Sequence, residues 1–188
     1  MIYYPDAFLD NLLLEDIQYG DLTCRALNIN HQLGTITFTC REAGCVSGIT
    51  LGCRLLAKLG LTVTAHLQEG DFAKQGDCLI SAEGRADALH QGWKVVQNVL
   101  EWSCGVSDYM AKMLEIYHRY QPKGQIACTR KNIPNTKLLA TQAVLAGGGI
   151  IHRQGCSETI LLFANHRHFL SEPNNWLQQV TQLRQAAP

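Results

Sequence analysis

Two short apolar segments in the last third of the chain restrict the possible folds most. Residues 125–129 and 159–163 consist mainly of apolar side chains, and each precedes a helical pattern, over 136–145 and 176–184. Strands that are apolar on both faces and alternate with helices are typical of a parallel α/β sheet or barrel. A closed barrel needs about eight such units, whereas two fit before Pro188. We therefore expect an α/β protein whose parallel part is incomplete in this chain.

The preceding residues combine helix patterns with strands of alternating polarity. Leucines that recur at helical spacing predict helices, and apolar residues at every second position predict strands. The predicted elements, in chain order, are a helix over 5–15, a polar turn over 15–23, a strand over 35–40, a helix over 49–59, and strands over 61–67 and 77–83. Residues 86–120 predict two helices that are broken near Gly105.

The charge balance excludes one large class of proteins. The 188 residues carry 16 Lys and Arg against 16 Asp and Glu, which gives a formal net charge of zero. A dedicated nucleic-acid-binding protein usually carries a large basic surplus, so we expect no nucleic-acid partner. Because 46% of the residues are hydrophobic, the chain can form a packed core. Any phosphate or carboxylate ligand must be bound by locally clustered charge.

Neither a membrane span nor a secretory leader is predicted. The longest uncharged run, 138–151, is too short and too polar to cross a bilayer, and the chain does not begin with a basic region followed by an apolar one. The 8 cysteines are scattered singly, without a C-x-x-C pair. We interpret them as buried, reduced thiols of a cytoplasmic protein, with zinc ligation as the less favoured alternative.

The densest group of charged and polar side chains directly follows the first apolar strand. This segment, 129–137, begins with Thr129 and contains Arg130, Lys131 and Lys137. Ligands of α/β proteins bind at the carboxyl ends of parallel strands, and Arg and Lys suit phosphate or carboxylate groups. We predict an anion site here, and a solvated basic loop is the alternative interpretation.

A glycine run and a second basic pair follow the next helix. Gly147, Gly148 and Gly149 precede His152 and Arg153. Glycines allow backbone N–H groups to approach an anion closely, although most such runs are simple turns. Two basic groups in successive strand–helix units support an anion site more strongly than either group alone.

Asn165 and His166 follow the second apolar segment, where an active-site side chain would stand. The end of a loop is the simpler interpretation of this pair. His168 nearby suggests a metal site, but no carboxylate or cysteine lies at usable spacing. We therefore predict no metal ligands here.

Taken together, these residues resemble the core of the quinolinate phosphoribosyltransferase family, the carboxylating nicotinate-nucleotide pyrophosphorylases. The matching positions in the second half are Arg130-Lys131, Pro134, Gly147-Gly148-Gly149, His152-Arg153, Gly155 and Asn165-His166. Those in the first half are Glu15-Asp16, Gly20-Asp21, Thr23, Arg41-Glu42, Gly44, Gly48, Gly70-Asp71, Gly76-Asp77, Asn98 and Gly105.

The resemblance implies an N-terminal α/β sandwich followed by a C-terminal α/β (TIM-like) barrel. The expected regions are a helical segment over 1–24, the sandwich over 25–108, and the first part of the barrel over 109–188. Members of the family transfer ribose 5-phosphate from phosphoribosyl pyrophosphate, with Mg²⁺, to the nitrogen of quinolinate and then release CO₂. Their active sites are built at a two-fold interface, which implies a homodimer or a larger symmetric assembly.

The resemblance also implies roles for individual residues. Arg130, His152 and Arg153 would bind the acid substrate, and Lys131 would serve the substrate or the phosphates as the catalytic lysine. The remaining substrate-binding or phosphate-binding positions are Lys94, Thr129, Asn165, His166, Lys137, Gly147, Gly148 and Gly149. Because the sugar passes through a cationic state, catalysis would rest on positioning and charge stabilisation.

Several positions depart from the family pattern. The family has Glu-Arg at Trp93-Lys94 and Lys at Phe163, so Lys94 loses the bidentate fork and Phe163 removes a charge. Other departures are Ile151 for Asn, Asn135 for Gly and Cys104 for Ser. We therefore predict an acceptor that is less anionic than quinolinate, as in a molybdenum-transport-associated paralogue of the family. The alternative is a non-catalytic anion-binding accessory protein linked to molybdenum transport.

Overall fold

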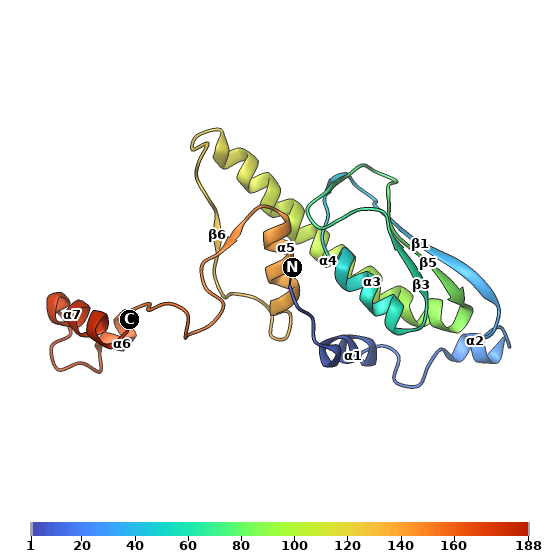
Figure 1. Ribbon diagram of the computed structural model, residues 1–188, viewed down its shortest axis with the longest axis horizontal. Coiled ribbons are helices and arrows are strands. Elements are labelled where there is room, and N and C mark those ends of the chain that lie inside the picture. The colour runs from blue at the N-terminus through green and yellow to red at the C-terminus, as the bar shows by residue number, and fades with distance from the viewer. Residues whose placement is uncertain (1, 188) are drawn as a thin grey trace. The chain divides into compact units, whose positions relative to one another are not determined.

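A computed structural model describes residues 2–187 of the chain (Figure 1). The chain divides into two compact units, Met1–His152 and Arg153–Pro188. The second unit contains two helices, α6 (Ala164–Arg167) and α7 (Trp176–Ala186). None of the described helices is both long and apolar enough to cross a membrane.

An antiparallel sheet of three strands lies at the centre of the first unit. β5 (Cys78–Arg85) is flanked by β1 (Leu33–Thr39) on one side and by β3 (Thr62–Ala65) on the other. The short strands β2 (Gly44–Cys45) and β4 (Phe72–Ala73) form a separate antiparallel pair. The strands predicted over 35–40, 61–67 and 77–83 are thus confirmed as β1, β3 and β5.

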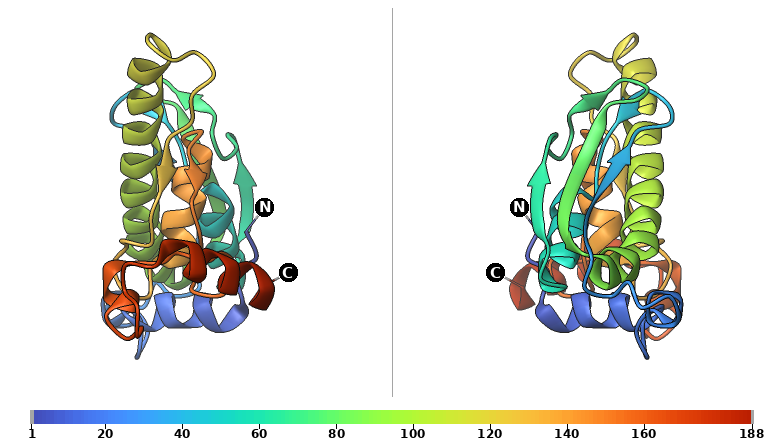
Figure 2. Two further views of the ribbon diagram at one scale, coloured as in Figure 1. Left: turned by 90° about the vertical axis from the view of Figure 1, so that its left-hand side faces the viewer. Right: turned by 90° about the vertical axis from the view of Figure 1, so that its right-hand side faces the viewer.

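Helices α3 (Ile49–Lys58) and α4 (Ala86–His118) pack on one face of this sheet (Figure 2). The side chains that the sheet and the two helices bury together include Phe38, Leu51, Leu55, Leu56, Ile80, Ala82, Val96 and Leu100. The opposite face of the sheet is polar and exposed, with Thr35, Thr37 and Thr64 on it. This one-sided burial is the reason for the alternating polarity of the strands.

Helix α4 is continuous from Ala86 to His118, which corrects the prediction of two helices broken near Gly105. Gly105 is exposed, and nothing lies within 4 Å of the place that a Cβ would take. A glycine inside a helix costs about 1 kcal/mol relative to alanine. Leu100 and Met110, which are buried on either side of it along the helix, offset that cost.

The N-terminal segment contains one helix that was predicted and one that was not. α1 (Asp6–Leu14) confirms the helix predicted over 5–15. α2 (Leu22–Ala26) forms at the end of the predicted polar turn. Its cap is Asp21, whose carboxylate accepts a hydrogen bond from the N–H of Cys24 at 2.5 Å.

A carboxylate from the loop between β3 and β4 caps α3. Glu69 accepts hydrogen bonds from Ser47 Oγ at 2.8 Å, from the N–H of Gly48 at 3.0 Å and from the N–H of Thr50 at 3.0 Å. The positive end of the helix dipole favours this negative charge. Gly48 has a φ of 88°, in the left-handed region that glycine adopts without strain.

The parallel part of the first unit is small. β6 (Ala127–Cys128) pairs in parallel with β7 (Ile150–Ile151), and α5 (Lys137–Ala146) connects them. The strand predicted over 159–163 was wrong, because these residues pair with no strand among residues 2–187. The segment directly after the glycine run takes that place beside β6 instead. α5 and α7 confirm the helices predicted over 136–145 and 176–184.

Candidate functional site

Pairing of β6 with β7 brings two predicted basic groups to one edge of the parallel sheet. The backbone N–H of His152 donates a hydrogen bond to the carbonyl of Cys128 at 2.9 Å. Because Thr129 follows Cys128 directly, His152 lies beside the start of the 129–137 segment. The segments that follow β6 and β7 leave the sheet there, at the carboxyl ends of the two strands, where α/β proteins bind ligands.

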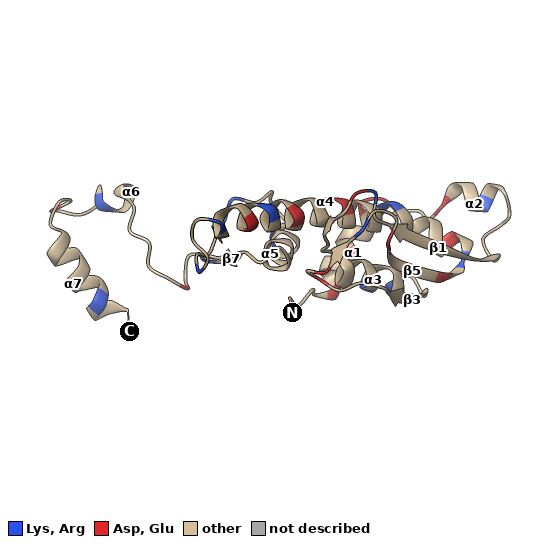
Figure 3. Ribbon diagram, turned by 90° about the horizontal axis from the view of Figure 1, so that it is seen from above, with Lys and Arg blue, Asp and Glu red and all other residues tan. Residues whose placement is uncertain are grey.

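The 129–137 segment presents its basic side chains to solvent. Arg130 and Lys131 are exposed, as is Lys137, which is the first residue of α5. The backbone of the segment is held by its own hydrogen bonds, including one from the N–H of Asn132 to the carbonyl of Arg130 at 3.1 Å. The chain as a whole is neutral, so three cations within this segment concentrate positive charge there, which suits an anion. Figure 3 colours the Lys and Arg positions blue along the ribbon.

The glycine run ends α5 and packs closely against α4, which differs from the predicted phosphate-binding role. The N–H groups of Gly147, Gly148 and Gly149 all donate to carbonyls in the last turns of α5, so none is directed at an anion. A Cβ on Gly147 would lie 2.4 Å from the carbonyl oxygen of Ser107, and one on Gly149 would lie 2.9 Å from the sulfur of Met110. The absence of a side chain at Gly147 and Gly149 therefore allows the end of α5 to pack closely on α4.

Three predicted site residues, Arg153, Asn165 and His166, belong to the second unit. Asn165 and His166 lie in α6 rather than at the end of a strand. The ring of Phe163 stacks on that of His166, with centroids 5.9 Å apart and planes inclined by 15°. His166 Nδ1 accepts the N–H of Phe163 at 3.0 Å, which leaves the ring proton on Nε2, where it can be donated to a ligand. Arg153, half-buried, is the first residue of this unit.

Lys94 is exposed in the first half of α4, away from the β6–β7 edge. Its amine donates to Gln97 Oε1 at 2.9 Å and lies 5.5 Å above the ring of Trp93. This half of α4 packs on the antiparallel sheet, whereas the parallel strands pack against Met110 and Leu114 in the other half. The first unit thus does not bring Lys94 together with His152.

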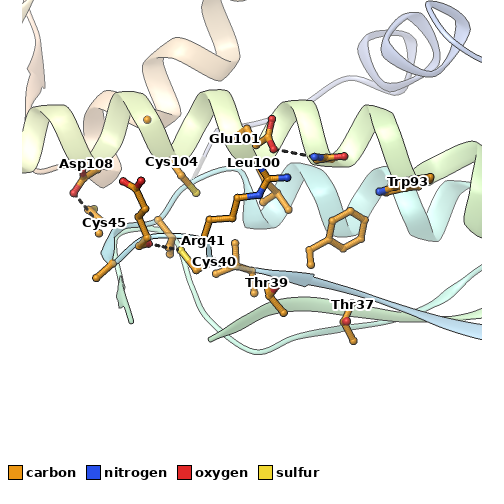
Figure 4. Close-up of a pocket in the computed structure, with 18 residues that line it drawn as sticks. Thr37, Thr39, Cys40, Arg41, Cys45, Trp93, Leu100, Glu101, Cys104 and Asp108 are labelled. Carbon is orange, nitrogen blue, oxygen red and sulfur yellow. Dashed lines mark hydrogen bonds between the residues drawn. The ribbon is translucent and has the colours of Figure 1, made fainter. Parts of the chain in front are cut away.

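A groove beside α4 was not found from the sequence (Figure 4). It has a volume of about 610 Å³ and lies between α4, β1 and the loop that leads to β2. Phe38 and Leu100 contribute apolar lining, and Arg41 and Trp93 add a guanidinium and an indole. Family positions named from the sequence line it, among them Arg41, Gly44 and Cys104, but they were not recognised as one groove.

A thiol in the groove is not a nucleophile at neutral pH. Burial raises the pKa of Cys104 to about 11, and its Sγ donates to the carbonyl of Ser47 at 3.4 Å. The thiolate is the reactive form of cysteine, so Cys104 stays protonated and unreactive there.

The described residues contain no large cluster of metal-ligating side chains. No group of three or more His, Cys, Asp or Glu side chains that could hold an ion occurs among residues 2–187. Mg²⁺ needs oxygen ligands, usually one or two carboxylates with substrate phosphates. Such a site needs no cluster of three protein ligands, so the Mg²⁺ that the resemblance implies stays a prediction, and we assign no step to it.

Comparison with known families covers almost the whole chain. The model of the quinolinate phosphoribosyl transferase N-terminal domain matches residues 21–104, and that of the C-terminal domain matches residues 106–188. The chain belongs to the quinolinate phosphoribosyltransferase family. This membership confirms the resemblance that the motifs indicated.

Individual relatives place the chain within this family. It is 61% identical over all 188 residues to a protein of Escherichia coli O6:H1 named "Putative pyrophosphorylase ModD", and covers 66% of that protein. A Pasteurella multocida protein of the same name is 52% identical, with 67% of its length covered. The chain thus spans about two thirds of the length of these relatives. Within the family it is similar to the ModD proteins.

A solved structure supports the fold assignment. NadC from Streptococcus pyogenes matches with a TM-score of 0.87 and 26% sequence identity, over 97% of this chain and 64% of that one. The predicted α/β class, with an N-terminal sheet domain followed by a C-terminal α/β domain, is confirmed.

One departure from the family pattern leaves the backbone unchanged. Asn135 stands where the family usually has glycine, and its φ is 67°. Asparagine tolerates this left-handed region better than most residues with a side chain. The turn before α5 is therefore kept, whereas Phe163 and Lys94 change the charge or the geometry of the side chain itself.

Proposed function

We propose that the protein is a phosphoribosyltransferase of the pyrophosphorylase type. It would transfer the phosphoribosyl group from phosphoribosyl pyrophosphate to a ring nitrogen of a heterocyclic acid. The bond from the anomeric carbon to the pyrophosphate oxygen breaks, its electron pair leaves with pyrophosphate, and a carbon–nitrogen bond forms. The observation that carries this proposal is the hydrogen bond from His152 to Cys128, which brings two family-type basic groups to one edge of a parallel sheet.

The proposed roles follow from charge and position. Arg130 and Arg153 pair with the carboxylate of the acceptor, because a guanidinium can hold a carboxylate with two parallel hydrogen bonds. Lys131 stabilises the charge that develops on the leaving pyrophosphate, and Lys137 adds a cation to the same surface. His152 completes the acceptor side, with a further contact from Thr129. The family resemblance assigns additional substrate contacts to Asn165 and His166, which belong to the second unit.

The acceptor would be less anionic than quinolinate. Phe163 replaces a family lysine, so its position cannot pair with a second carboxylate. Its ring is half exposed and already stacks on His166, which gives an apolar face suited to a planar heterocycle. Lys94 retains a charge but offers no bidentate fork. We infer a ring acid with one carboxylate.

A symmetric homodimer or larger assembly belongs to this proposal, as does a cytoplasmic location. Lys94 is exposed and lies far along α4 from the residues that pack on the parallel strands. A second subunit could present its Lys94 to the site, as the family architecture implies. The scattered single cysteines suit a reducing compartment.

The first test supplies phosphoribosyl pyrophosphate, Mg²⁺ and a panel of nitrogen-heterocycle acids to the purified protein and measures released pyrophosphate. We expect release with a monocarboxylate and little with quinolinate. Lys131→Ala should lower the rate by about 100-fold or more, whereas Lys123→Ala, at an exposed turn outside the site, should not change it. Calorimetric binding without release by any acid would contradict the enzyme and favour the anion-binding accessory protein.

The second test addresses acceptor choice. Lys94→Arg combined with Phe163→Lys restores the family guanidinium at one position and the family charge at the other. We expect quinolinate use to rise by at least about tenfold, the value of one charged hydrogen bond. Arg153→Ala should abolish binding of the acid without changing the circular dichroism of the chain. Unchanged acid binding by Arg153→Ala would overturn the assigned site.

A further inference from the structure

The ammonium of Lys94 is held from two sides on the surface of α4. It donates a hydrogen bond to Gln97 Oε1 at 2.9 Å and lies 5.5 Å from the centre of the Trp93 ring. Lysine has a flexible four-carbon side chain, which loses much rotamer freedom when its ammonium is fixed in one place. Trp93 and Gln97 therefore restrict the positions of this ammonium before any ligand binds.

Gln97 is itself oriented by a third side chain. Its amide nitrogen donates to Glu101 Oε1 at 2.8 Å, and this bond leaves the amide oxygen to accept from Lys94. Spacings of three and four residues along a helix make these side chains neighbours on its surface. The result is a chain of hydrogen bonds in which a neutral amide separates the carboxylate from the ammonium.

This arrangement leaves the charge of Lys94 for a ligand. Lys94 is exposed, and it takes part in none of the ion pairs found between residues 2 and 187. Gln97 accepts one of the three N–H groups of the ammonium, so two remain for a carboxylate. A glutamate in place of Gln97 would form an ion pair with Lys94 and compete with the ligand.

The helix beneath these residues gives them a fixed base. Val96 and Leu100 are buried between α4 and the antiparallel sheet, at 0% and 5% exposure. Trp93 is 48% exposed and lines the groove beside α4, as do Gln97 and Glu101 (Figure 4). The indole is therefore available to Lys94 on one side and is only partly used in packing.

We propose that Trp93 and Gln97 are positioning residues, which hold the ammonium of Lys94 where it pairs with the carboxylate of the acceptor. This inference rests on the proposed function, in which Lys94 is presented to the acceptor site. The family arginine has a planar fork that is pre-organised by itself. Here a lysine with two supporting contacts takes its place. Such support strengthens binding, because less side-chain freedom is lost when the acid binds.

The test is a double-mutant cycle on the KM for the acid. Released pyrophosphate is measured with phosphoribosyl pyrophosphate, Mg²⁺ and either pyridine-2-carboxylate or pyridine-3-carboxylate, each of which keeps one carboxylate of quinolinate. We expect Trp93→Ala and Gln97→Leu each to raise the KM for the acid about two- to tenfold, because Lys94 must then be immobilised on binding. The kcat and the KM for phosphoribosyl pyrophosphate should stay unchanged, as for loss of uniform binding.

The second half of the cycle repeats both substitutions in a Lys94→Ala background. Neither should have a further effect there, because a positioning residue acts only through the group that it holds. Trp93→Phe keeps an aromatic face beside the ammonium and should retain most of the wild-type affinity. Tyr3→Ala is the matched control, since it removes an aromatic side chain that is 77% exposed in the N-terminal segment, and it should leave both KM values unchanged.

Two results would overturn this inference and leave the proposed function standing. One is an active wild type whose KM for the acid is unchanged in Trp93→Ala and Gln97→Leu. The other is an equal rise of the KM with and without Lys94, which would mean that the two residues do not act through it. A wild type that releases no pyrophosphate with either acid contradicts the proposed function, and this inference falls with it. Circular dichroism checks that every variant is folded.

Discussion

The two halves of α4 take part in two regions that differ greatly in how much they bury. Among the described residues, the core of the antiparallel sheet contains 20 buried side chains, whereas the core beside the parallel strands contains 3, Met110, Leu114 and Val144. β5 has 8 residues, but β6 and β7 have 2 each. The first region completes its own core, and the second does not.

This difference bears on function. The predicted basic residues follow the two short parallel strands. The apolar side chains of this region are partly exposed, for example Leu145 at 44% and Ile150 at 37%. A site on such a region needs further surface to exclude water and to hold a substrate. The antiparallel region buries most of the core, whereas the basic residues of the proposed site lie beside the parallel strands.

Paired leucine substitutions test the comparison with the largest expected effect. Leu55 is fully buried in the first core, and Leu114 is 8% exposed in the second. We expect Leu55→Ala to lower the free energy of unfolding by about 4 kcal/mol and Leu114→Ala by about 2 kcal/mol, because the second site is less enclosed. Urea denaturation measures both. Equal losses would show that the two cores contribute alike.

Alanine substitutions at two glycines, Gly147 and Gly105, are expected to change stability by intermediate amounts. Gly147 has a φ of −75°, which any residue adopts, but a Cβ there would meet the Ser107 carbonyl. We expect Gly147→Ala to destabilise the protein by about 1–3 kcal/mol. Gly105→Ala, where space is open, should stabilise it by about 0.5–1 kcal/mol. Thermal unfolding of both variants checks this, and a tolerated Gly147→Ala would contradict the packing role.

The smallest expected effect concerns acid stability of the sandwich. A hydrogen bond from Arg85 holds the pKa of Asp87 below its usual value. Because the folded pKa is depressed, the stabilisation is present above the unfolded pKa of about 4 and is lost as the pH falls through the folded pKa. Asp87→Asn should reduce the loss of unfolding free energy at acid pH by less than about 1 kcal/mol. The Tm of this variant, measured as a function of pH, should therefore fall less steeply in acid than that of the wild type. An unchanged acid slope in this variant would contradict the assignment.

Local patterns predicted most of the helices and the long strands. Leucines at helical spacing marked α1 and α3, and alternation marked β1 and β5, since both arise from burial on one side of an element. The error at Gly105 had a physical cause, because the propensity of one residue is small beside the burial of a helix on both sides of it. The strand predicted over 159–163 failed because apolar composition does not reveal a pairing partner.

The candidate site divides in the same way. Arg130, Lys131 and His152 were predicted as site residues from residue type and from their place after strand or glycine patterns, and the pairing of β6 with β7 places His152 beside the start of the 129–137 segment. The groove at Arg41 and Trp93 was missed, because its walls come from segments that lie far apart in the sequence.

Most of the helices and long strands, the neutral net charge with its basic segment, and the family resemblance follow from the amino-acid sequence alone, because these depend on residue type and near-neighbour spacing. Three-dimensional packing was needed to show which segment pairs with β6 and that Gly147 and Gly149 lie against α4. Each of these depends on contacts between residues that are distant in the chain, and such contacts cannot be predicted from the pattern of neighbouring residues.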